Sequence, residues 1–379
     1  MANIIDYIKE YGDLNFSQKE FNSVDGLILS QFSYLKLDEI VPGVGENRDN
    51  MELRDILYHP LYEQLYGDVR YEKNNRNLYE TMAKSRRFGF IELNHYINLI
   101  NVKWEMQFSA ICCFLPGGGC CVTYRGTDEN LISWKEDFNM AFLPTIPAQI
   151  KAMDYLNYVA ERITGDFMLA GHSKGGNLSI YAAMKCPKET YERISRIYSF
   201  DGPGFLKTAT SEKELAAIDD RLIKLVPHSS IVGMLLQEHE SYTVVESKNF
   251  GILQHDPFNW VVEGDDFIYR NDINDLIMIH NEAINEWAKG SDTETLRAFG
   301  NQVYDIMIEC GVNDLNDFKG NYGEIIRKFT HVVENMEIEQ KDVFKKVIKA
   351  LFDCVIETIK GQQGKLKIDD KDKTSRRNI

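Results

Sequence analysis

The sequence predicts an α/β fold in which a mostly parallel sheet carries helices on both faces. The first observation is an alternation of short apolar runs with segments of helical periodicity after residue 160. Strands that alternate with helices pair in parallel, because each helix returns the chain to the same edge of the sheet. The strand candidates are Phe167–Ala170, Arg196–Phe200, Leu222–Val226 and Tyr242–Glu246.

The second observation is composition. The 379 residues are 44% hydrophobic and 11% aromatic, enough for a large buried core. The formal charge of −15 opposes binding to nucleic acid or to an anionic membrane surface. No window has the basic and apolar pattern of a signal peptide or the length of a membrane span. We therefore expect a cytoplasmic protein without an integral membrane segment.

Upstream of the alternating region, two apolar runs separated by Pro-Gly-Gly-Gly at 116–119 predict a β-hairpin over Met106–Leu115 and Cys120–Tyr124. The cysteine pairs at 112–113 and 120–121 lie in these runs and lack the spacing of zinc sites. We expect reduced core thiols, no metal and no cofactor. Helical patterns elsewhere cover Ile4–Tyr11, Val24–Leu35, Leu53–Leu65, Asn77–Lys84, Trp134–Phe142, Gln149–Thr164 and Leu178–Cys186.

Four segments follow from these patterns. We expect a helical and irregular segment over 1–100 that packs on the core, and an α/β core over 101–270. Long amphipathic helices are expected over 271–360, where apolar residues recur at helical spacing. The last segment, 361–379, is rich in Lys and Arg and poor in apolar residues, so we expect a solvated tail.

The strongest chemical signal is Gly-His-Ser-Lys-Gly at 171–175, between a short apolar strand and a helix. This G-x-S-x-G pattern in a strand-turn-helix context predicts the nucleophile elbow of an α/β-hydrolase, with Ser173 as the nucleophile. The turn needs glycine on both sides, since a Cβ there would crowd the strained backbone. At the helix N-terminus, the backbone N–H of Lys174 is a candidate oxyanion donor. The alternative is a glycine-rich turn whose serine only caps the helix.

A second signal is Arg-Gly-Thr at 125–127 after a strand, followed by Trp134 and Asp137. Together with the later elbow, this order resembles the fungal-type triglyceride lipases of class 3, and more closely an Mbeg-like bacterial group of lipase-related proteins. The resemblance spans roughly residues 106–267. It implies that Thr127 supplies the second oxyanion donor and that residues 128–147 lie over the site like a lid.

The base of such a site is a histidine that follows the serine in chain order, which excludes His59 and His95. His172 adjoins the serine and is expected to point away from the reaction and to pack within the elbow. The remaining candidates are His228, His239 and His255. We choose His255, which lies in a loop after the last strand candidate, where the resemblance also expects the catalytic histidine; His228 is the second choice.

The acidic residue that would orient the histidine departs from the pattern of the class 3 lipases. Those lipases place an aspartate after the next strand, where this chain has Ser229-Ser230. Asp201 is a physically reasonable substitute, because it ends the strand after the nucleophile helix and strand C-termini converge at one sheet edge. Pancreatic-type lipases resemble this arrangement. The alternative is that Asp201 only organises the Gly-Pro-Gly turn at 202–204.

These residues predict a serine hydrolase that cleaves a carboxylic ester through an acyl-enzyme on Ser173, with a small acyl ester or lipid as substrate. Thioesters and acyl transfer stay open. The rival prediction is a non-catalytic scaffold of the same fold that binds a partner through its helical C-terminal region and basic tail.

Overall fold

The computed structural model describes residues 1–67, 69–127, 135, 136, 139, 140, 143–206, 209–236, 241–249 and 251–271, with a few isolated residues beyond 271. Within these residues, nine strands form one sheet in the order β1-β2-β3-β4-β5-β6-β7-β8-β11. Their bounds are β1 Met51–Glu52, β2 Glu92–Asn101, β3 Met106–Phe114, β4 Cys120–Tyr124, β5 Phe167–His172, β6 Ile194–Phe200, β7 Leu222–Pro227, β8 Thr243–Val245 and β11 Tyr269–Arg270.

The centre of the sheet is parallel. Strands β4 to β8 pair in parallel, each with the next, whereas β1, β2 and β3 on one side and β11 on the other pair antiparallel. A separate antiparallel pair joins β9 (Val262–Glu263) to β10 (Asp266–Phe267). All parallel strands therefore end at one edge, and the loops after β4, β5, β6 and β7 meet there.

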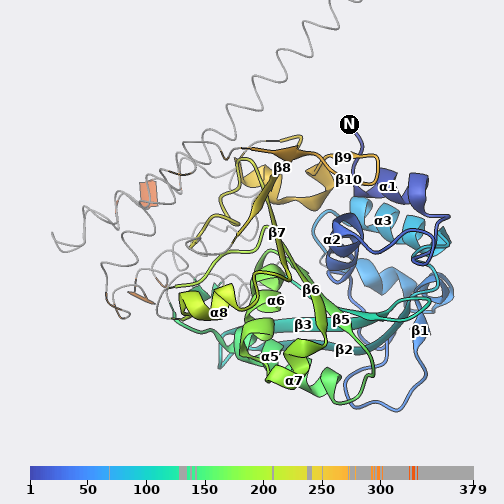
Figure 1. Ribbon diagram of the computed structural model, residues 1–379, viewed down its shortest axis with the longest axis horizontal. Helices are drawn as coiled ribbons and strands as arrows, with labels where there is room; N and C mark the ends of the chain where they lie inside the picture. The colour runs from blue at the N-terminus through green and yellow to red at the C-terminus, as the bar shows by residue number, and fades with distance from the viewer. Residues whose placement is uncertain are drawn as a thin grey trace, which may run out of the picture.

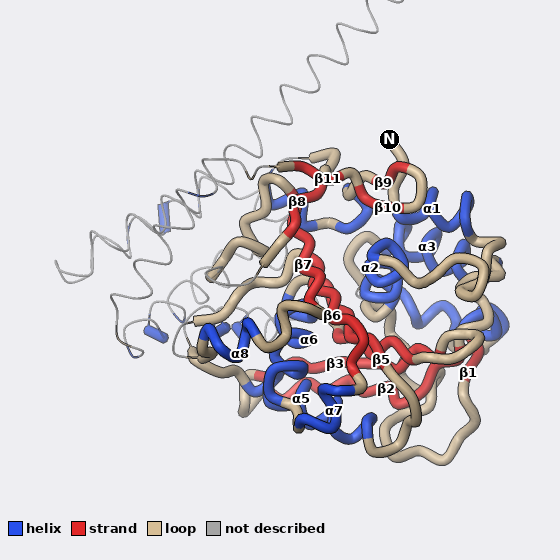
Figure 2. Tube along the Cα trace, viewed as in Figure 1, coloured by secondary structure: helices blue, strands red, loops and turns tan. Residues whose placement is uncertain are grey.

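Helices cover both faces of the sheet (Figure 1). One face carries α1 (Ile4–Tyr11), α2 (Ser23–Phe32) and α3 (Glu72–Lys84), and the other carries α5 (Pro147–Ala160), α6 (Lys174–Lys185), α7 (Lys188–Glu192) and α8 (Glu212–Ala216). Figure 2 shows the strands as one twisted band between the two groups. This three-layer arrangement confirms the predicted α/β class.

Alternate residues of each central strand enter different cores, as the period of two requires. In β3, Cys113 belongs to the core beneath α1–α3 and Cys112 to the core beneath α5 and α6. Cys112 Sγ lies 3.5 Å from the Tyr155 hydroxyl, and Cys113 Sγ lies 3.7 Å from Thr123 Oγ1. The adjacent cysteines thus face opposite sides of the sheet as free buried thiols, and burial raises the pKa of Cys113 to about 12.

The N-terminal helices are fixed by caps and by one buried ion pair. Asn3 and Asn22 each form a capping box, with α1 and α2 respectively. The fully buried Arg87 guanidinium pairs with Asp25 of α2 through Nε at 2.7 Å and also donates to the backbone oxygens of Lys19 and Glu20. The loop between α1 and α2 is therefore held to the chain after α3.

One sequence prediction is wrong in this region, and one strand was not predicted. The helix expected over Leu53–Leu65 is two short 3₁₀ helices, η1 (Leu53–Tyr58) and η2 (Tyr62–Tyr66), because Pro60 interrupts the backbone hydrogen bonding between them. Strand β2 was not predicted; its several asparagines are unfavourable in strands, and pairing with β3 outweighs that preference.

Other predictions agree with the structure or lie beyond it. The β3–β4 hairpin and the strands β5 to β8 lie where the patterns place them. The helix expected over Trp134–Phe142 lies mostly outside the described residues, as do the C-terminal helices and the tail. In the part of the chain that is described, no helix has the length and apolarity that a membrane crossing requires.

Candidate active site

Ser173 lies on a strained turn between β5 and α6. Its backbone has φ 60° and ψ −132°, a conformation that residues other than glycine rarely adopt. A Cβ on Gly171 would lie 2.1 Å from the Gly175 carbonyl oxygen, and one on Gly175 would lie 2.1 Å from the Tyr124 carbonyl oxygen. Glycine is thus required sterically on both sides, and the elbow has the form that the sequence predicts. The fold is that of an α/β-hydrolase.

Asp201 and His255 meet at the same sheet edge. His255, the last residue of η3 (Gly251–His255), places Nδ1 at 2.6 Å from Asp201 Oδ2. The carboxylate side chain is 1% exposed and the imidazole 18%. Because a carboxylate only accepts hydrogen bonds, the ring proton lies on Nδ1 and Nε2 of the neutral ring is a proton acceptor. This is the tautomer that a general base acting through Nε2 needs.

Two further groups surround Asp201. The Ser230 hydroxyl donates to Asp201 Oδ1 and accepts the Gly233 backbone N–H at 2.8 Å. A Cβ at Gly233 would lie 2.2 Å from Asp201 Oδ1, so only glycine leaves room for the carboxylate. Ser230, in the loop after β7, is therefore a hydrogen-bond donor to Asp201.

The Arg-Gly-Thr turn at 125–127 packs against the elbow. A Cβ on Gly126 would lie 3.1 Å from Ser173 Cβ and 2.6 Å from the His172 carbonyl oxygen. Thr127 follows directly, and the Lys174 backbone begins α6 beside the serine. In the described part of the chain, no hydrogen bond joins the Ser173 hydroxyl to the His255 ring. The structure thus joins the expected base to the expected acid and places the expected nucleophile at the adjacent turn.

The other histidines lie differently. His228 contacts Gln254 Nε2, which is 3.1 Å from its Nδ1 and 3.3 Å from its Nε2. Among the described residues, the side-chain contacts of Asp201 go to His255 and Ser230, not to His228. His239 is outside the described residues. His172, expected to pack within the elbow, is 4% exposed, and its ring lies tilted against that of His255 with ring centroids 4.5 Å apart.

Sequence reasoning also missed the side chain of Lys174. Its ammonium is buried and donates to Glu136 Oε2 at 2.8 Å, to Gln107 Oε1 at 2.7 Å and to the Gln107 carbonyl oxygen at 3.0 Å. Glu136 in turn accepts the backbone N–H groups of Gln107 and Ala148. The signal in the sequence was a lysine at the first position of the helix that follows the nucleophile. Through this pair, the elbow is tied to β3 and to the start of α5.

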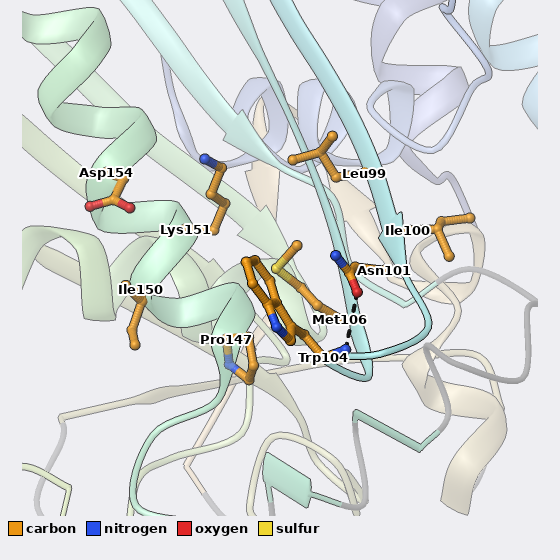
Figure 3. Close-up of a pocket in the computed structure, with 9 residues that line it drawn as sticks. All are labelled: Leu99, Ile100, Asn101, Trp104, Met106, Pro147, Ile150, Lys151 and Asp154. Carbon is orange, nitrogen blue, oxygen red and sulfur yellow. Dashed lines mark hydrogen bonds between the residues drawn. The ribbon is translucent and has the colours of Figure 1, made fainter.

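An apolar pocket of about 400 Å³ lies between the β2–β3 turn and the first turns of α5 (Figure 3). Because Ala110 of β3 pairs with Tyr124 at the end of β4, the first residues of β3 extend beyond β4 at the edge where the elbow lies. Trp104 and Met106 lie near Pro147, and Lys151 and Asp154 project from α5 (Figure 3). None of Ser173, Asp201 and His255 lines it.

Comparison with known proteins gives the family. No curated protein matches the chain. The crystal structure of M37 lipase is similar at 14% sequence identity with a TM-score of 0.36, over 56% of this chain and 70% of that one. The model of the Mbeg1-like family matches residues 82–305, more than half of the chain and all of the elements that form the elbow and the Asp201–His255 pair. The chain belongs to the Mbeg1-like family, as the resemblance in its motifs implies.

Proposed function

We propose that this protein is a serine-dependent hydrolase of carboxylic esters. The observation that carries the proposal is the 2.6 Å contact between His255 Nδ1 and Asp201 Oδ2, at the sheet edge where β5 ends in the strained Ser173. A buried carboxylate beside an imidazole, next to a serine on an elbow, is the set of groups that nucleophilic acyl transfer uses.

In the first half of the reaction, Ser173 Oγ attacks the carbonyl carbon of the ester, and His255 Nε2 takes the hydroxyl proton. The imidazolium that forms is stabilised by Asp201, whose negative charge is held in place by the Ser230 hydroxyl. His255 then gives the proton to the leaving alcohol as the C–O bond of the tetrahedral intermediate breaks. The product is an acyl-enzyme on Ser173.

The negative charge of the tetrahedral intermediate needs donors close to the serine. We assign the backbone N–H groups of Thr127 and Lys174 to this role, because the Arg-Gly-Thr turn packs on the elbow and Lys174 is the first residue of α6. The N-terminus of a 12-residue helix adds a favourable dipole. Loss of one such donor reduces kcat by about 10²–10³ in enzymes of this type.

In the second half, water attacks the acyl carbon as His255 takes its proton, and His255 then gives that proton to Ser173 Oγ as the bond between the acyl carbon and Oγ breaks and the acid is released. The substrate class is a small acyl ester or a lipid ester, and thioesters belong in the same panel. Free, buried cysteines in β3 and β4 support a reducing compartment, and we place the activity in the cytoplasm.

The test is covalent labelling of the purified protein with a fluorophosphonate. Wild type should be labelled, whereas Ser173→Ala should not. Asp201→Asn should be labelled slowly, because it removes the carboxylate that fixes the His255 tautomer. Ser17→Ala, which removes an exposed serine in the loop between α1 and α2, is the matched control and should be labelled like wild type.

Equal labelling of wild type and Ser173→Ala would place the reactive residue elsewhere and refute the assignment. No labelling of the folded wild type would favour the scaffold. The absence of an aspartate near Ser230 favours the scaffold, but the hydrogen bond from Ser230 to Asp201 weakens that argument.

A further inference from the structure

His172 is a buried imidazole in contact with the proposed base. It is 4% exposed, and its ring lies 4.5 Å from that of His255 at an interplanar angle of 34°. His172 Nε2 lies 2.8 Å from the backbone carbonyl oxygen of His255, and Nδ1 lies 3.1 Å from the hydroxyl of Tyr34. Both nitrogens thus have a partner, and one partner is the residue that takes the serine proton.

The partners determine the tautomer of His172. A carbonyl oxygen only accepts hydrogen bonds, so Nε2 carries the proton and donates to His255. Nδ1 of the neutral ring is then an acceptor and takes the hydrogen bond of the Tyr34 hydroxyl. Burial, and secondly the neighbouring His255, hold the pKa of His172 well below its ordinary value. The ring is therefore neutral at pH 7, with its proton on Nε2.

Tyr34 lies 138 residues before His172 in the chain. It follows α2 and places its hydroxyl over the Arg-Gly-Thr turn, where a Cβ on Gly126 would lie 2.1 Å from the tyrosine oxygen. The same hydroxyl lies 3.4 Å from the His172 carbonyl oxygen. Tyr34 therefore contacts both the elbow and the turn that carries the proposed oxyanion donor Thr127.

We propose that His172 is a positioning residue, which holds the backbone of His255 through its Nε2–H. Tyr34 fixes the tautomer of His172. This inference rests on the proposed function. Asp201 holds the His255 ring and His172 holds its carbonyl oxygen, so the imidazole is fixed from the side chain and from the backbone. A displacement of about 1 Å at a reacting group can cost about 10²-fold in rate, so the second anchor has a measurable effect.

The neutral state of His172 matters for the same step. When His255 takes the serine proton, it becomes an imidazolium 4.5 Å from the His172 ring. A second positive charge at that distance would oppose the proton transfer, whereas a neutral ring that donates to the His255 carbonyl does not. Tyr34 stabilises that neutral tautomer, because its hydroxyl donates to Nδ1 and leaves the proton on Nε2.

Three variants of the full-length protein test the proposal. His172→Phe keeps a ring for stacking and removes both hydrogen bonds, and His172→Gln keeps an N–H donor near the position of Nε2. Tyr34→Phe removes only the hydroxyl that contacts Nδ1. His59→Phe is the control, since it also removes an imidazole hydrogen bond, from the Leu61 N–H at 3.2 Å, in the loop between η1 and η2.

The first readout is the second-order rate of fluorophosphonate labelling. We expect His172→Phe to be slower by about 10- to 100-fold, the loss that misplacement of a catalytic group causes. His172→Gln should recover most of the labelling rate, and His59→Phe should be labelled at the wild-type rate. The rate of Tyr34→Phe should lie between those of His172→Phe and wild type. A wild-type rate for His172→Phe, or no recovery in His172→Gln when both variants melt like wild type, would overturn the proposal.

The second readout is ¹⁵N NMR of the histidine rings, which does not depend on activity. In wild type at pH 7, His172 should show a protonated Nε2 and an unprotonated Nδ1. In His172→Phe, the Nδ1–H resonance of His255 should shift or disappear, because the His255 backbone has lost its hydrogen bond to His172 and the imidazole moves relative to Asp201. A His172 proton on Nδ1, or an unchanged His255 resonance, would refute the positioning role.

The two readouts separate this inference from the proposed function. If wild type does not react with the fluorophosphonate but His172→Phe still changes the His255 resonance, the hydrolase proposal fails and the positioning role of His172 stands. If wild type reacts and the His255 resonance is the same in His172→Phe, the hydrolase stands and the positioning role fails.

Discussion

Replacement of Lys174 by methionine should destabilise the protein strongly, although the residue is next to the nucleophile and not part of the proton transfer. Lys174 and Glu136 form a salt bridge of 2.8 Å whose side chains are 1% and 0% exposed. Methionine has a similar shape without the charge. Among the described residues, Glu136 would then be a buried carboxylate with no counter-charge and two backbone donors, from Gln107 and Ala148.

The magnitude follows from the contacts that are lost. Lys174→Met removes three hydrogen bonds of a charged group and leaves Gln107 Oε1 and the Gln107 carbonyl oxygen without that donor. Breaking a buried ion pair by removing one member costs about 3–5 kcal/mol. For a domain of this size, that loss corresponds to a decrease in Tm of roughly 6–20 °C.

A double-mutant cycle with Glu136→Gln measures the pair itself. The glutamine oxygen can replace only one of the two carboxylate oxygens, Oε2 on the Gln107 N–H or Oε1 on the Ala148 N–H, but the double variant has no buried charge. It should be less destabilised than the sum of the two single variants by at least about 2 kcal/mol. Free energies of unfolding from urea titration provide the four corners of the cycle, with calorimetry for Tm.

The matched control is Lys188→Met in the i,i+4 pair with Glu192, where the side chains are 82% and 61% exposed. That change should alter the stability by no more than about 0.5 kcal/mol. A cost below about 1 kcal/mol for Lys174→Met, or additive effects in the cycle, would show that the ammonium is solvated and would refute the reasoning.

Three further predictions concern the same region. Ser230→Ala should lower the free energy of unfolding by about 1–3 kcal/mol, because Asp201 Oδ1 loses its hydroxyl donor and the Gly233 N–H loses its acceptor. Urea unfolding measures this free energy, and an unchanged value would contradict the prediction. Gly175→Ala should lower Tm by several degrees and abolish labelling, since its Cβ would meet backbone at 2.1 Å, whereas Gly67→Ala, with its nearest atom at 3.5 Å, should not. Because the pKa of folded His172 lies well below 6.5, the unfolded chain binds more protons as pH falls below 6.5. Stability should therefore decrease by up to about 1.4 kcal/mol per pH unit there, and His172→Gln should remove that contribution.

The fold could be predicted largely from the sequence because its signals are local. The apolar runs that form β3 to β8 are bounded by turns, and the Gly-His-Ser-Lys-Gly elbow requires glycine for steric reasons that depend on a few neighbouring atoms. Strand β2 was missed because its identity depends on pairing with β3, which outweighs the low strand preference of its asparagines.

The expected site residues differ in how the sequence points to them. Ser173 is marked by its motif. Asp201 and His255 are separated by 54 residues, and the sequence only indicated that both follow strands of the same sheet. Their 2.6 Å contact was one arrangement among several, with His228 as the rival, until the loops after β6 and β8 were placed.

The sequence by itself determined the alternation of strands and helices and the Gly-His-Ser-Lys-Gly elbow, because each depends on residues that are near one another in the chain. Only the tertiary structure decided that Ser230 supports Asp201, that Lys174 pairs with Glu136, and that Tyr34 contacts His172, 138 residues further along the chain. These are single contacts between distant segments, formed where buried polar groups must find partners. No periodicity in the sequence marks such contacts.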